Sequence, residues 1–476
     1  MMRFAALSLV LISLMTAGCG REKKLTSTSP EAIAVYTEGV GLWEKFYYPE
    51  AKAAFEKALA ADSTFAMAWC RLALVESASQ DIPDAQLAIR KALLSSAGAT
   101  RREQLFIQMW GKRIDFKNEE AATLADSLLA LYPDEKEAYL FRGNLYEEID
   151  KDYDAALRFY RKAVAADSGY AQAVMSLGYA YSNLGDQPRA VEQMQHYIAL
   201  APNAADPRAS YGDLLLRAGR YDEALDQYHQ SLQLKSDYWY SIRQIGLVHA
   251  ILGRLRLSEE ETQRGLALLP ASHQIEAVRL AADASLDLDR NDDAAAAEKF
   301  REALVIDTTN GTAAYGLVRA LARQKEFGAA RELLLRIHAE LHQRNLLHAP
   351  AMLDYHLARA LVLTAERNLD EAREACDSAI QYSTPLTRPS IYRQIAEIAS
   401  ARGDDEAALE ACEEALSVNP NSPRILLTLT KVYHMKGDSR LTAEIGNRLL
   451  GLWSGADPDF APLKELRRIL RTTPPT

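Results

Sequence analysis

The sequence has little of the residues that break helices or favour strands. Glycine and proline contribute only 23 and 17 of 476 residues, and continuous runs of Val, Ile and Thr are nearly absent. Strands are built from β-branched runs and disordered chains are rich in Gly and Pro, so a β-rich protein and a disordered one are both excluded. Alanine is abundant, and hydrophobic residues make up 48% of the chain. This composition is typical of a packed helical protein.

The chain also lacks a strongly basic segment. Its 55 Lys and Arg residues stand against 65 Asp and Glu residues, which leaves a net charge of −10. Proteins that bind nucleic acid owe much of their affinity to clustered basic side chains that neutralise phosphates. The sequence therefore predicts no nucleic-acid partner.

The hydrophobic run at the N-terminus is too short to span a membrane. It covers residues 4–15 and follows a single positive charge at Arg3, which is the pattern of a signal peptide. Residues 16–19 (TAGC) resemble the lipobox of bacterial lipoproteins, although that family prefers Leu at the position of Thr16. The resemblance implies acylation of Cys19. Because Gly20 follows in place of Asp, it also implies an outer-membrane location facing the periplasm, with simple secretion as the alternative.

Small residues recur along the rest of the chain at a step of about 34 residues. Ten alanines show this step: Ala51, Ala85, Ala121, Ala156, Ala190, Ala224, Ala296, Ala330, Ala372 and Ala408. The pattern resembles the tetratricopeptide repeat (TPR), a helix–turn–helix unit in which these alanines hold position 20. Gly143, Gly178 and Gly212 hold the small position 8, where the two helices of one repeat touch.

The resemblance implies an all-α superhelix, a TPR solenoid of about twelve repeats with a C-terminal capping helix. The repeats begin at Ala32, Ala66, Arg102, Lys136, Ala171, Ala205, Trp239, Ala277, Gly311, Leu353, Pro389 and Pro423. We divide the chain into a signal peptide (1–18), a lipidated cysteine with a flexible tether (19–31), repeats 1–9 (32–344), a spacer (345–352), repeats 10–12 (353–456), and a capping helix with tail (457–476). A surface helix on anionic lipid is the alternative for the last segment.

Motifs that carry reaction chemistry are missing. The sequence shows no glycine-rich phosphate loop, no Gly-x-Ser-x-Gly elbow and no pair of cysteine knuckles. His338, His342, His348 and His356 cluster, but Ala339 stands where a zinc peptidase needs Glu, so we predict no metal site. The sequence predicts no enzymatic activity and no cofactor.

Three cysteines remain besides Cys19. Cys376 and Cys412 both hold position 24 of neighbouring repeats, on helices packed about 8–10 Å apart, which is too far for a disulfide. We expect these two to be buried thiols without a bridge, and the odd count leaves Cys70 without a partner as well.

In the TPR family the first helix of each repeat lines a concave groove, and its side chains at positions 2, 5, 9 and 12 of the repeat point into that groove. Mapped onto repeats 4–7, the predicted peptide-binding groove contains Asn144, Glu147, Gln172, Met175, Tyr179, Ser182, Asp213, Tyr240, Arg243 and the neighbouring Gln244. A secondary, basic groove suited to acidic segments contains Tyr315, Arg319, Arg323, Arg393 and Glu397. The carboxylate clamp of chaperone-binding repeats is absent, because Leu140, Ser176 and Ser210 occupy clamp positions.

The sequence thus predicts a non-catalytic scaffold that binds proteins or peptides in its groove and is held at the bacterial cell envelope as a lipoprotein. Polar side chains mixed with tyrosines suit an extended peptide backbone. Two alternatives stay open: a glycan-binding outer-membrane lipoprotein built on the same repeats, and an intracellular TPR adaptor.

Overall fold

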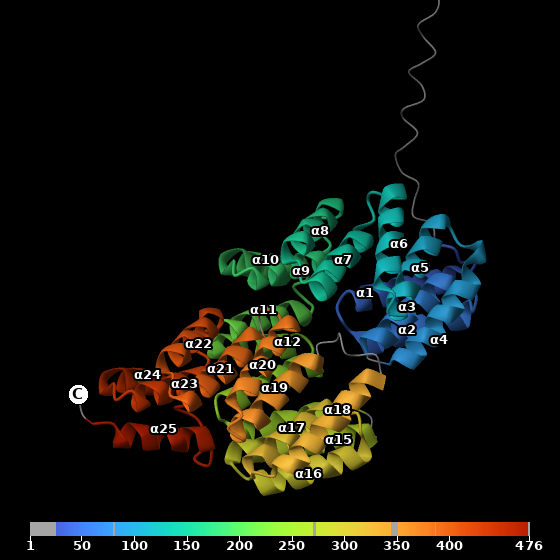
Figure 1. Cartoon of the computed structure of the whole chain (residues 1–476). Coiled ribbons are helices and arrows are strands. Elements are labelled where there is room, and N and C mark those ends of the chain that lie inside the picture. The colour runs from blue at the N-terminus through green and yellow to red at the C-terminus, as the bar shows by residue number, and fades with distance from the viewer. Residues whose placement is uncertain (1–24, 80, 270–272, 344–350, 386, 475–476) are drawn as a thin grey trace, which may run out of the picture. The chain divides into compact units, whose positions relative to one another are not determined.

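The computed structural model describes residues 25–79, 81–269, 273–343, 351–385 and 387–474 (Figure 1). The predicted signal peptide and Cys19 lie outside these residues, as do His348 and most of the predicted spacer. All regular elements in the described ranges are helical. None of these helices combines the length and the apolar character that crossing a membrane requires.

Twenty-four of the helices form twelve hairpins, and α25 follows them. The bounds are α1 (Pro30–Trp43), α2 (Tyr48–Ala61), α3 (Ala66–Ala78), α4 (Ile82–Ser95), α5 (Arg101–Ile114), α6 (Asn118–Leu131), α7 (Lys136–Leu145), α8 (Tyr153–Ala166), α9 (Ala171–Asn183), α10 (Gln187–Leu200), α11 (Asp206–Arg217), α12 (Tyr221–Leu234), α13 (Trp239–Ile251), α14 (Leu255–Leu266), α15 (His273–Arg290), α16 (Asp293–Ile306), α17 (Gly311–Arg323), α18 (Phe327–Gln343), α19 (Ala351–Ala365), α20 (Leu369–Gln381), α21 (Arg388–Arg402), α22 (Asp405–Val418), α23 (Pro423–Met435), α24 (Ser439–Leu452) and α25 (Ala461–Thr472). A 3₁₀ turn, η1 (Ser96–Gly98), follows α4, and a π-type turn, η2 (Tyr146–Asp150), continues α7. Each predicted repeat therefore corresponds to one hairpin.

The small residues at positions 8 and 20 allow the two helices of a hairpin to pack closely. A methyl group on Gly143 of α7 would lie 2.3 Å from the ring of Tyr160 on α8. Ala156, at position 20 of the same repeat, has no exposed surface. A larger side chain at either position would force the helices apart, because protein interiors leave no spare volume. The sequence prediction about position 8 is confirmed here.

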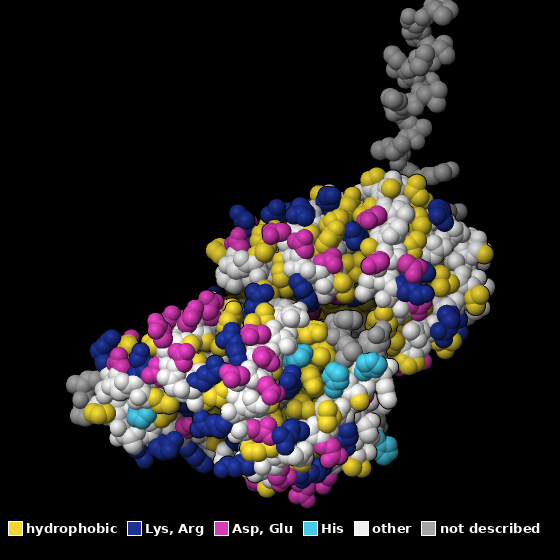
Figure 2. Space-filling model, in the orientation of Figure 1, with side chains coloured by type: hydrophobic (Ala, Val, Ile, Leu, Met, Phe, Trp, Pro, Cys, Tyr) yellow, Lys and Arg dark blue, Asp and Glu magenta, His cyan; other side chains and the backbone are white. Residues whose placement is uncertain are grey.

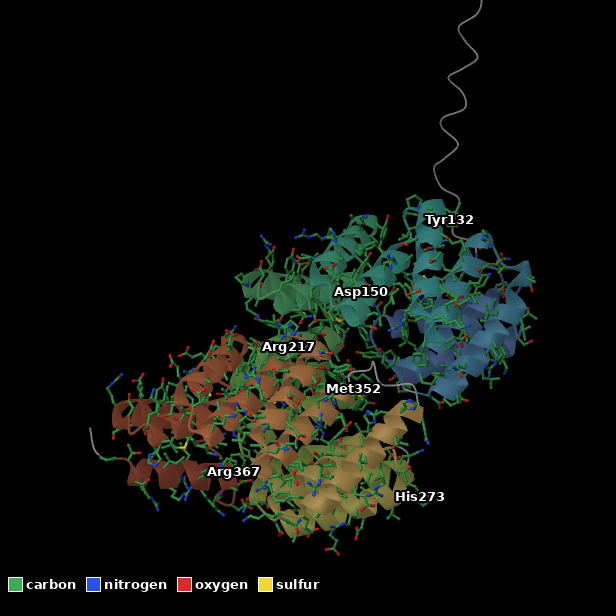
Figure 3. All side chains as sticks on the ribbon, in the orientation of Figure 1. Tyr132, Asp150, Arg217, His273, Met352 and Arg367 are labelled. Carbon is green, nitrogen blue, oxygen red and sulfur yellow. The ribbon has the colours of Figure 1, made fainter. Side chains whose placement is uncertain are left out.

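The turn between the two helices has a fixed backbone conformation. The residue at position 15 has a positive φ wherever the structure describes it, apart from repeat 4. In repeat 4 the residue with positive φ is Lys151, at position 16. Glycine holds the position in five repeats, but Phe46, Phe116, Asn291, Lys325 and Arg367 adopt the same left-handed conformation. Left-handed backbone costs an L-residue about 1–2 kcal/mol, so hairpin packing overrides the local preference here. Figure 3 labels Arg367 at the turn after α19.

The chain divides into two compact units. The first contains residues 1–150 and 158–170, and the second contains residues 151–157 and 171–476. The core of the first runs through α1 to α7 and includes Phe55, Phe65 and Ile107. A buried bidentate ion pair joins Arg71 of α3 to Glu137 of α7, with N–O distances of 2.9 and 2.6 Å.

The predicted spacer at 345–352 does not separate two hydrophobic cores. Leu341 of α18 and Met352 and Val362 of α19 belong to one core cluster with α15, α16 and α17. Figure 3 labels Met352 near the start of α19. Apolar side chains on α18 and α19 still pack against each other across the interrupted repeat period, since stacking depends on the helix faces and not on the loop that joins them.

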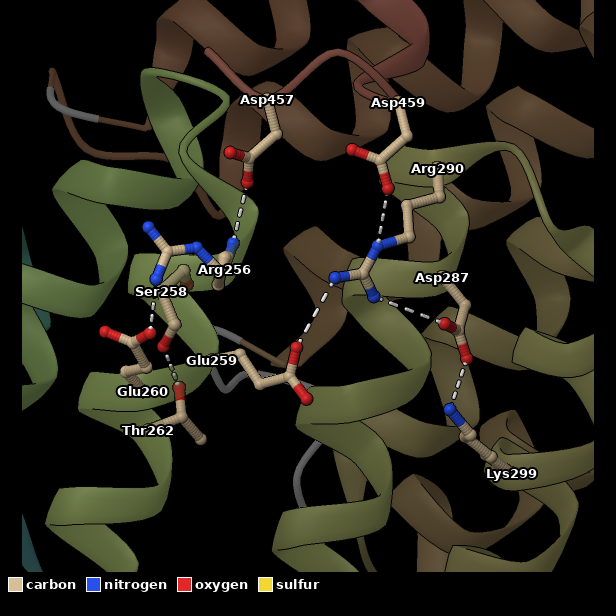
Figure 4. Close-up of polar contacts among 10 residues, drawn as sticks. All are labelled: Arg256, Ser258, Glu259, Glu260, Thr262, Asp287, Arg290, Lys299, Asp457 and Asp459. Atoms are coloured by element: carbon tan, nitrogen blue, oxygen red, sulfur yellow. Dashed lines mark hydrogen bonds and ion pairs between the residues drawn. The ribbon is translucent and has the colours of Figure 1, made fainter. Parts of the chain in front are cut away.

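Within the second unit, repeats 6–8 contact repeats 11 and 12 directly. Trp453 donates an indole N–H bond to the carbonyl of Ile251 (3.2 Å), and the amide of Asp457 donates to the carbonyl of Gly253 (2.9 Å). The Asp457 carboxylate accepts from the Arg256 amide at 2.8 Å, and Arg290 pairs with Asp459 at 3.1 Å (Figure 4). We call these contacts the closing contact. It joins residues that are 169 to 204 positions apart in the sequence, and it was not predicted from the sequence.

A second set of hydrogen bonds, with one ion pair, lies beside the closing contact. Asn421 donates to the carbonyl of Gly219 at 3.3 Å, Tyr221 donates to the carbonyl of Asn421 at 3.2 Å, and Arg424 pairs with Asp289 at 2.7 Å. The turns of repeats 6 and 7 therefore meet the loops of repeats 11 and 12.

The capping helix is confirmed as α25. Its apolar residues Leu463, Leu466 and Ile469 are buried. They pack on α23 and α24, and Leu463 and Leu466 share a core cluster with Leu255 of α14 and Leu286 of α15. The cap thus covers the last repeat and part of repeats 7 and 8. With its apolar face buried in this way, α25 offers no free apolar face to a lipid surface.

The predicted tether is shorter than expected at its C-terminal end. The amide of Thr26 donates to Glu103 at 2.9 Å, and the hydroxyl of Ser27 donates to Asp62 at 2.5 Å. Ser29 then caps α1, which begins at Pro30, by accepting from the amide of Ala32. Residues 26–31, assigned to the tether, are therefore fixed to the first compact unit, because their hydroxyls and amides have partners there.

Candidate functional site

The centre of the predicted groove is a buried carboxylate that accepts four hydrogen bonds. Asp213 of α11 is 7% exposed. Its Oδ1 accepts from Tyr228 (2.8 Å) and Gln244 (2.9 Å), and its Oδ2 accepts from Tyr179 (3.1 Å) and Tyr240 (2.6 Å). The donors come from α9, α12 and α13, so this one side chain ties three neighbouring repeats together.

Asp206, about two helical turns before Asp213 on α11, is a second buried carboxylate that accepts several hydrogen bonds. It accepts hydrogen bonds from Tyr197 (2.8 Å), Tyr238 (2.7 Å) and Ser210 (3.2 Å). Burial raises the pKa of Asp206 to about 6, against the lowering effect of the bonds from Tyr238 and Tyr197. Burial and the adjacent carboxylate also raise the pKa of Tyr197, so this phenol stays a donor.

Four of the predicted groove residues are buried, which corrects the expectation that they face a ligand. Gln172 (7%), Ser182 (6%), Asp213 (7%) and Gln244 (7%) are all inside. Their positions in the repeat suggested exposure, but Asp213 is enclosed by three tyrosines that bond to it, and Gln244 bonds to the same carboxylate. The buried Oγ of Ser182 has no hydrogen-bond partner. Asp213 and Gln244 act as structural links between repeats.

The remaining members of the groove fall into the two compact units. Asn144 and Glu147 belong to the first, where both lie beside the Tyr160 hydroxyl at 2.9 and 2.7 Å. Met175 and Tyr179 are half-buried on α9 in the second unit. The Arg217 guanidinium, labelled in Figure 3, lies 4.7 Å from the centre of the Tyr179 ring. The structure thus joins Tyr179, Asp213, Tyr240 and Gln244 in one network.

The accessible part of the groove in the second unit lies on α13. Arg243 is exposed and its guanidinium lies 5.5 Å from the Tyr240 ring and 5.6 Å from the Trp239 ring. Trp239 is 49% exposed and Leu247 is 46% exposed. We call Trp239, Arg243 and Leu247 the α13 face. Trp239 and Leu247 were not predicted as groove residues, although their spacing of four from Arg243 places all three on one side of the helix.

The secondary groove contains a cavity of about 600 Å³. Its lining comes from α15, α17, α19 and α21, which are the first helices of repeats 8–11. Tyr315, Arg319 and Arg393 line it, as predicted, and Leu357 and Leu361 of α19 form an apolar side. The Tyr315 hydroxyl donates to the carbonyl of Ala351 at 3.1 Å, which fixes its ring.

Two predicted members of the secondary groove do not line the cavity. Arg323 donates to the carbonyl of Leu288 at 3.0 Å and pairs with Asp293 at 3.0 Å, which holds it at the turn of repeat 8. Glu397 instead pairs with Arg393 at 2.5 Å. Their repeat positions placed both in the groove, but Arg323 is held by its partners in repeat 8, and Glu397 lies beside Arg393 of its own helix without lining the cavity.

Arg319 differs from its neighbours. Its Nε is buried and has no hydrogen-bond partner. Burial, and then the charges of Arg424, Arg323 and Arg393, lower its pKa to about 10, against the opposing effect of Asp289. The guanidinium stays charged at neutral pH. Its Nε is shielded from water and makes no hydrogen bond to the described residues in return.

The thiols and histidines have simple surroundings. Cys70, Cys376 and Cys412 are free and buried, and burial raises the pKa of each to about 12, so the thiols are inert. His338 lies against Tyr355 with ring centres 5.2 Å apart, and His356 stacks on Tyr382. Among the described residues no group of three or more His, Cys, Asp or Glu side chains is placed to hold a metal ion.

Comparisons with known proteins agree with the repeat assignment. Residues 117–171 and 175–238 match one tetratricopeptide repeat family, and residues 389–422 match a second. A 122-residue stretch is 29% identical to mouse (Mus musculus) superkiller complex protein 3. That stretch is 26% of this chain but only 8% of the mouse protein.

Solved structures give weaker likenesses. A crystal structure of MamA is 22% identical, with a TM-score of 0.29, and the match covers 34% of this chain and 93% of MamA. A monomeric IFIT1 mutant with Gppp-AAAA is 15% identical, with a TM-score of 0.39 over 90% of this chain and 92% of IFIT1. Scores this low carry no argument about ligands. The family matches and the paired helices together identify tetratricopeptide repeats in this chain, which folds as an all-α solenoid of about twelve such repeats with a capping helix.

Proposed function

We propose that this protein is a non-catalytic scaffold that binds a protein or peptide partner through the first helices of its repeats. TPR proteins in general bind protein partners and carry no reaction chemistry of their own. The observation that carries the proposal is the α13 face, where a tryptophan, an arginine and a leucine are exposed together on a helix that predicted groove residues share. Trp and Arg are the residues that most often dominate binding energy at protein interfaces.

The rigid support of this face strengthens the proposal. Tyr240, next to Trp239, is held by its bond to Asp213, and Gln244, next to Arg243, is held by the same carboxylate. A face fixed by its neighbours loses little conformational entropy when a partner binds. On the side of the molecule that Figure 2 shows, acidic and basic side chains are interspersed with hydrophobic ones, a mixture that is common at the rims of protein interfaces.

Site-specific photo-crosslinking tests this function. A photoreactive residue replaces Arg243 in one variant and Val305 in a control variant, since Val305 of α16 is 85% exposed and outside the predicted groove. A protein adduct that forms from position 243 and not from position 305 is expected. Loss of the same adduct in a variant with Trp239→Ser and Leu247→Ser supports the α13 face. Equal labelling from both positions, or no protein adduct from position 243, would overturn the proposal.

We further propose that the protein is exported and anchored to the outer membrane, facing the periplasm, through a lipid on Cys19. The support is the sequence of residues 1–20 alone. Incorporation of labelled palmitate that is lost in the Cys19→Ala variant is the expected result. Unlabelled protein in the cytosolic fraction would contradict export, and unlabelled protein in the periplasm would leave secretion without an anchor.

A further inference from the structure

The cavity between α17, α19 and α21 holds an arginine, Arg319, whose buried Nε has no partner among the residues that the structure describes. The arginines around Arg319 are all paired: Arg323 with Asp293 at 3.0 Å, Arg393 with Glu397 at 2.5 Å and Arg424 with Asp289 at 2.7 Å. Arg319 has a buried Nε that bonds to nothing in the described structure. A buried polar group without a partner destabilises the free protein, so its presence suits a site that a ligand completes.

The neighbouring carboxylates do not neutralise Arg319. Asp354 is part of the cavity lining, but burial alone raises its pKa and no arginine acts on it. Asp289, the acidic residue that does act on Arg319, is already paired with Arg424. Arg319 therefore has no ion-pair partner of its own among the described residues, and Arg393 adds a second cation that is shared with Glu397.

The lining selects the class of anion. A planar guanidinium with donors in a fork matches a carboxylate in two parallel bonds. Val318, Leu357 and Leu361 face the same cavity, so a group attached to that carboxylate meets apolar surface. Asp354 on the lining and Glu397 beside Arg393 disfavour an anion of higher charge, such as a phosphate dianion.

We propose that this cavity binds the carboxylate of an acidic peptide segment, with Arg319 as the principal donor and the α19 leucines holding an aliphatic side chain next to it. The proposal rests on the proposed scaffold function and names the chemistry of one of its partners. The volume of about 600 Å³ is in the range of pockets that enclose drug-sized ligands, so it holds a few residues of a longer segment.

Binding of matched peptide libraries to the full-length protein tests the proposal. The probe is a library of fluorescein-labelled, C-terminally amidated octapeptides of Leu, Ala and Ser with one Glu, and its twin carries Gln in place of Glu. Loss of a charge-assisted bond weakens binding by about 10- to 100-fold, so the best Glu peptide should bind that much more tightly than its Gln twin. Arg319→Gln should remove this difference, and Arg319→Lys should retain part of it.

Arg323→Gln is the matched control. It removes the same charge one helical turn away on α17, but Arg323 does not line the cavity, so peptide affinity should change less than about twofold. Circular dichroism and thermal melting of Arg319→Gln, which should melt no lower than the unsubstituted protein, exclude misfolding as the cause of a lost signal.

Three outcomes would overturn the carboxylate site. Equal binding of Glu and Gln peptides, or unchanged affinity in Arg319→Gln, would remove Arg319 from recognition. Succinate that binds as tightly as the peptide and displaces it would make the cavity a site for small carboxylates. If the peptides fail to bind while crosslinking from position 243 still captures a partner, the carboxylate site is rejected and the scaffold function stands. If the crosslinking fails, that result counts against the proposed function itself.

Discussion

The closing contact between repeats 6–8 and repeats 11–12 gives the sharpest test of the structure. Gly253, at position 15 of repeat 7, has φ of +71° and lies against Phe460. A methyl group at Gly253 would lie 2.4 Å from the Phe460 ring and 2.9 Å from the side chain of Ala456. Gly185, at the same position of repeat 5, has φ of +80° and nothing within 4 Å of that methyl group. The two glycines therefore share a backbone conformation and differ in the contact.

Gly253→Ala should destabilise the protein more than Gly185→Ala does. Both variants lose about 1–2 kcal/mol because alanine is forced into left-handed backbone. Only Gly253→Ala also overpacks a buried ring, which adds about 1–3 kcal/mol. This second contribution should appear as weaker protection of residues 453–466 in hydrogen exchange, by roughly 5- to 150-fold.

The assay combines hydrogen exchange by mass spectrometry with urea unfolding. In a variant whose other four tryptophans are replaced by Phe, Trp453 provides a local signal. It is 2% exposed and its indole bonds to Ile251, so its fluorescence should shift to the red when the closing contact opens. In a Phe460→Ala background, the extra cost of Gly253→Ala over Gly185→Ala should become smaller, because the clash with the ring is gone and only the close approach to Ala456 remains. Equal losses for the two glycine variants in the unsubstituted protein, within about 0.5 kcal/mol, would refute the closing contact.

Three further predictions concern the turns and the buried carboxylates. Lys325→Gly should raise the free energy of unfolding by about 0.5–1 kcal/mol in urea titrations, since Lys325 is exposed and has φ of +63°; a loss would show that the turn is not strained. Asp213→Ala should lower it by about 3–5 kcal/mol by leaving four buried donors unpaired, while Arg243→Ala on the surface should change it by less than about 0.5 kcal/mol. The pKa of Asp206 is raised from 3.8 to about 6 in the folded state, so the native protein binds more protons between these values and the contribution of Asp206 to stability is lost as pH rises from 4 to 6. Relative to Asp206→Asn, the unsubstituted protein should thus gain up to about 3 kcal/mol between pH 7 and pH 4 in thermal or urea unfolding, and parallel pH profiles would contradict the assignment.

The sequence predicted the helices and their pairing well because the contacts that define a repeat are local. Position 8 of the first helix meets the second helix of the same hairpin, as Gly143 meets Tyr160, and position 20 is buried there, as Ala156 shows. These constraints recur in most repeats, so they can be predicted from the spacing of small residues along the sequence. The predicted cavity residues Tyr315, Arg319 and Arg393 followed in the same way from repeat positions.

The groove was predicted less well because a repeat position gives the direction of a side chain and not its partners. Asp213 points toward the first helices as expected, but it is buried, because tyrosines from the repeats on both sides bond its Oδ2 while Tyr228 and Gln244 bond its Oδ1. Arg323 was expected in the secondary groove, yet a carbonyl and a carboxylate of the preceding repeat hold it. The pairing of such side chains depends on distances among three helices, which spacing does not give.

The sequence by itself determined the number of hairpins, their small contact positions and the capping helix, since each depends on neighbours within about one repeat. Only the tertiary structure decided that Trp453 and Asp457 would meet the turn of repeat 7 about 200 residues earlier, because that meeting depends on small rotations summed over five repeats. The tertiary structure also decided which arginine keeps a buried Nε without a partner among the described residues. Arg319 and Arg323 are one helical turn apart on α17, but only the packing of neighbouring helices places Arg319 in the cavity.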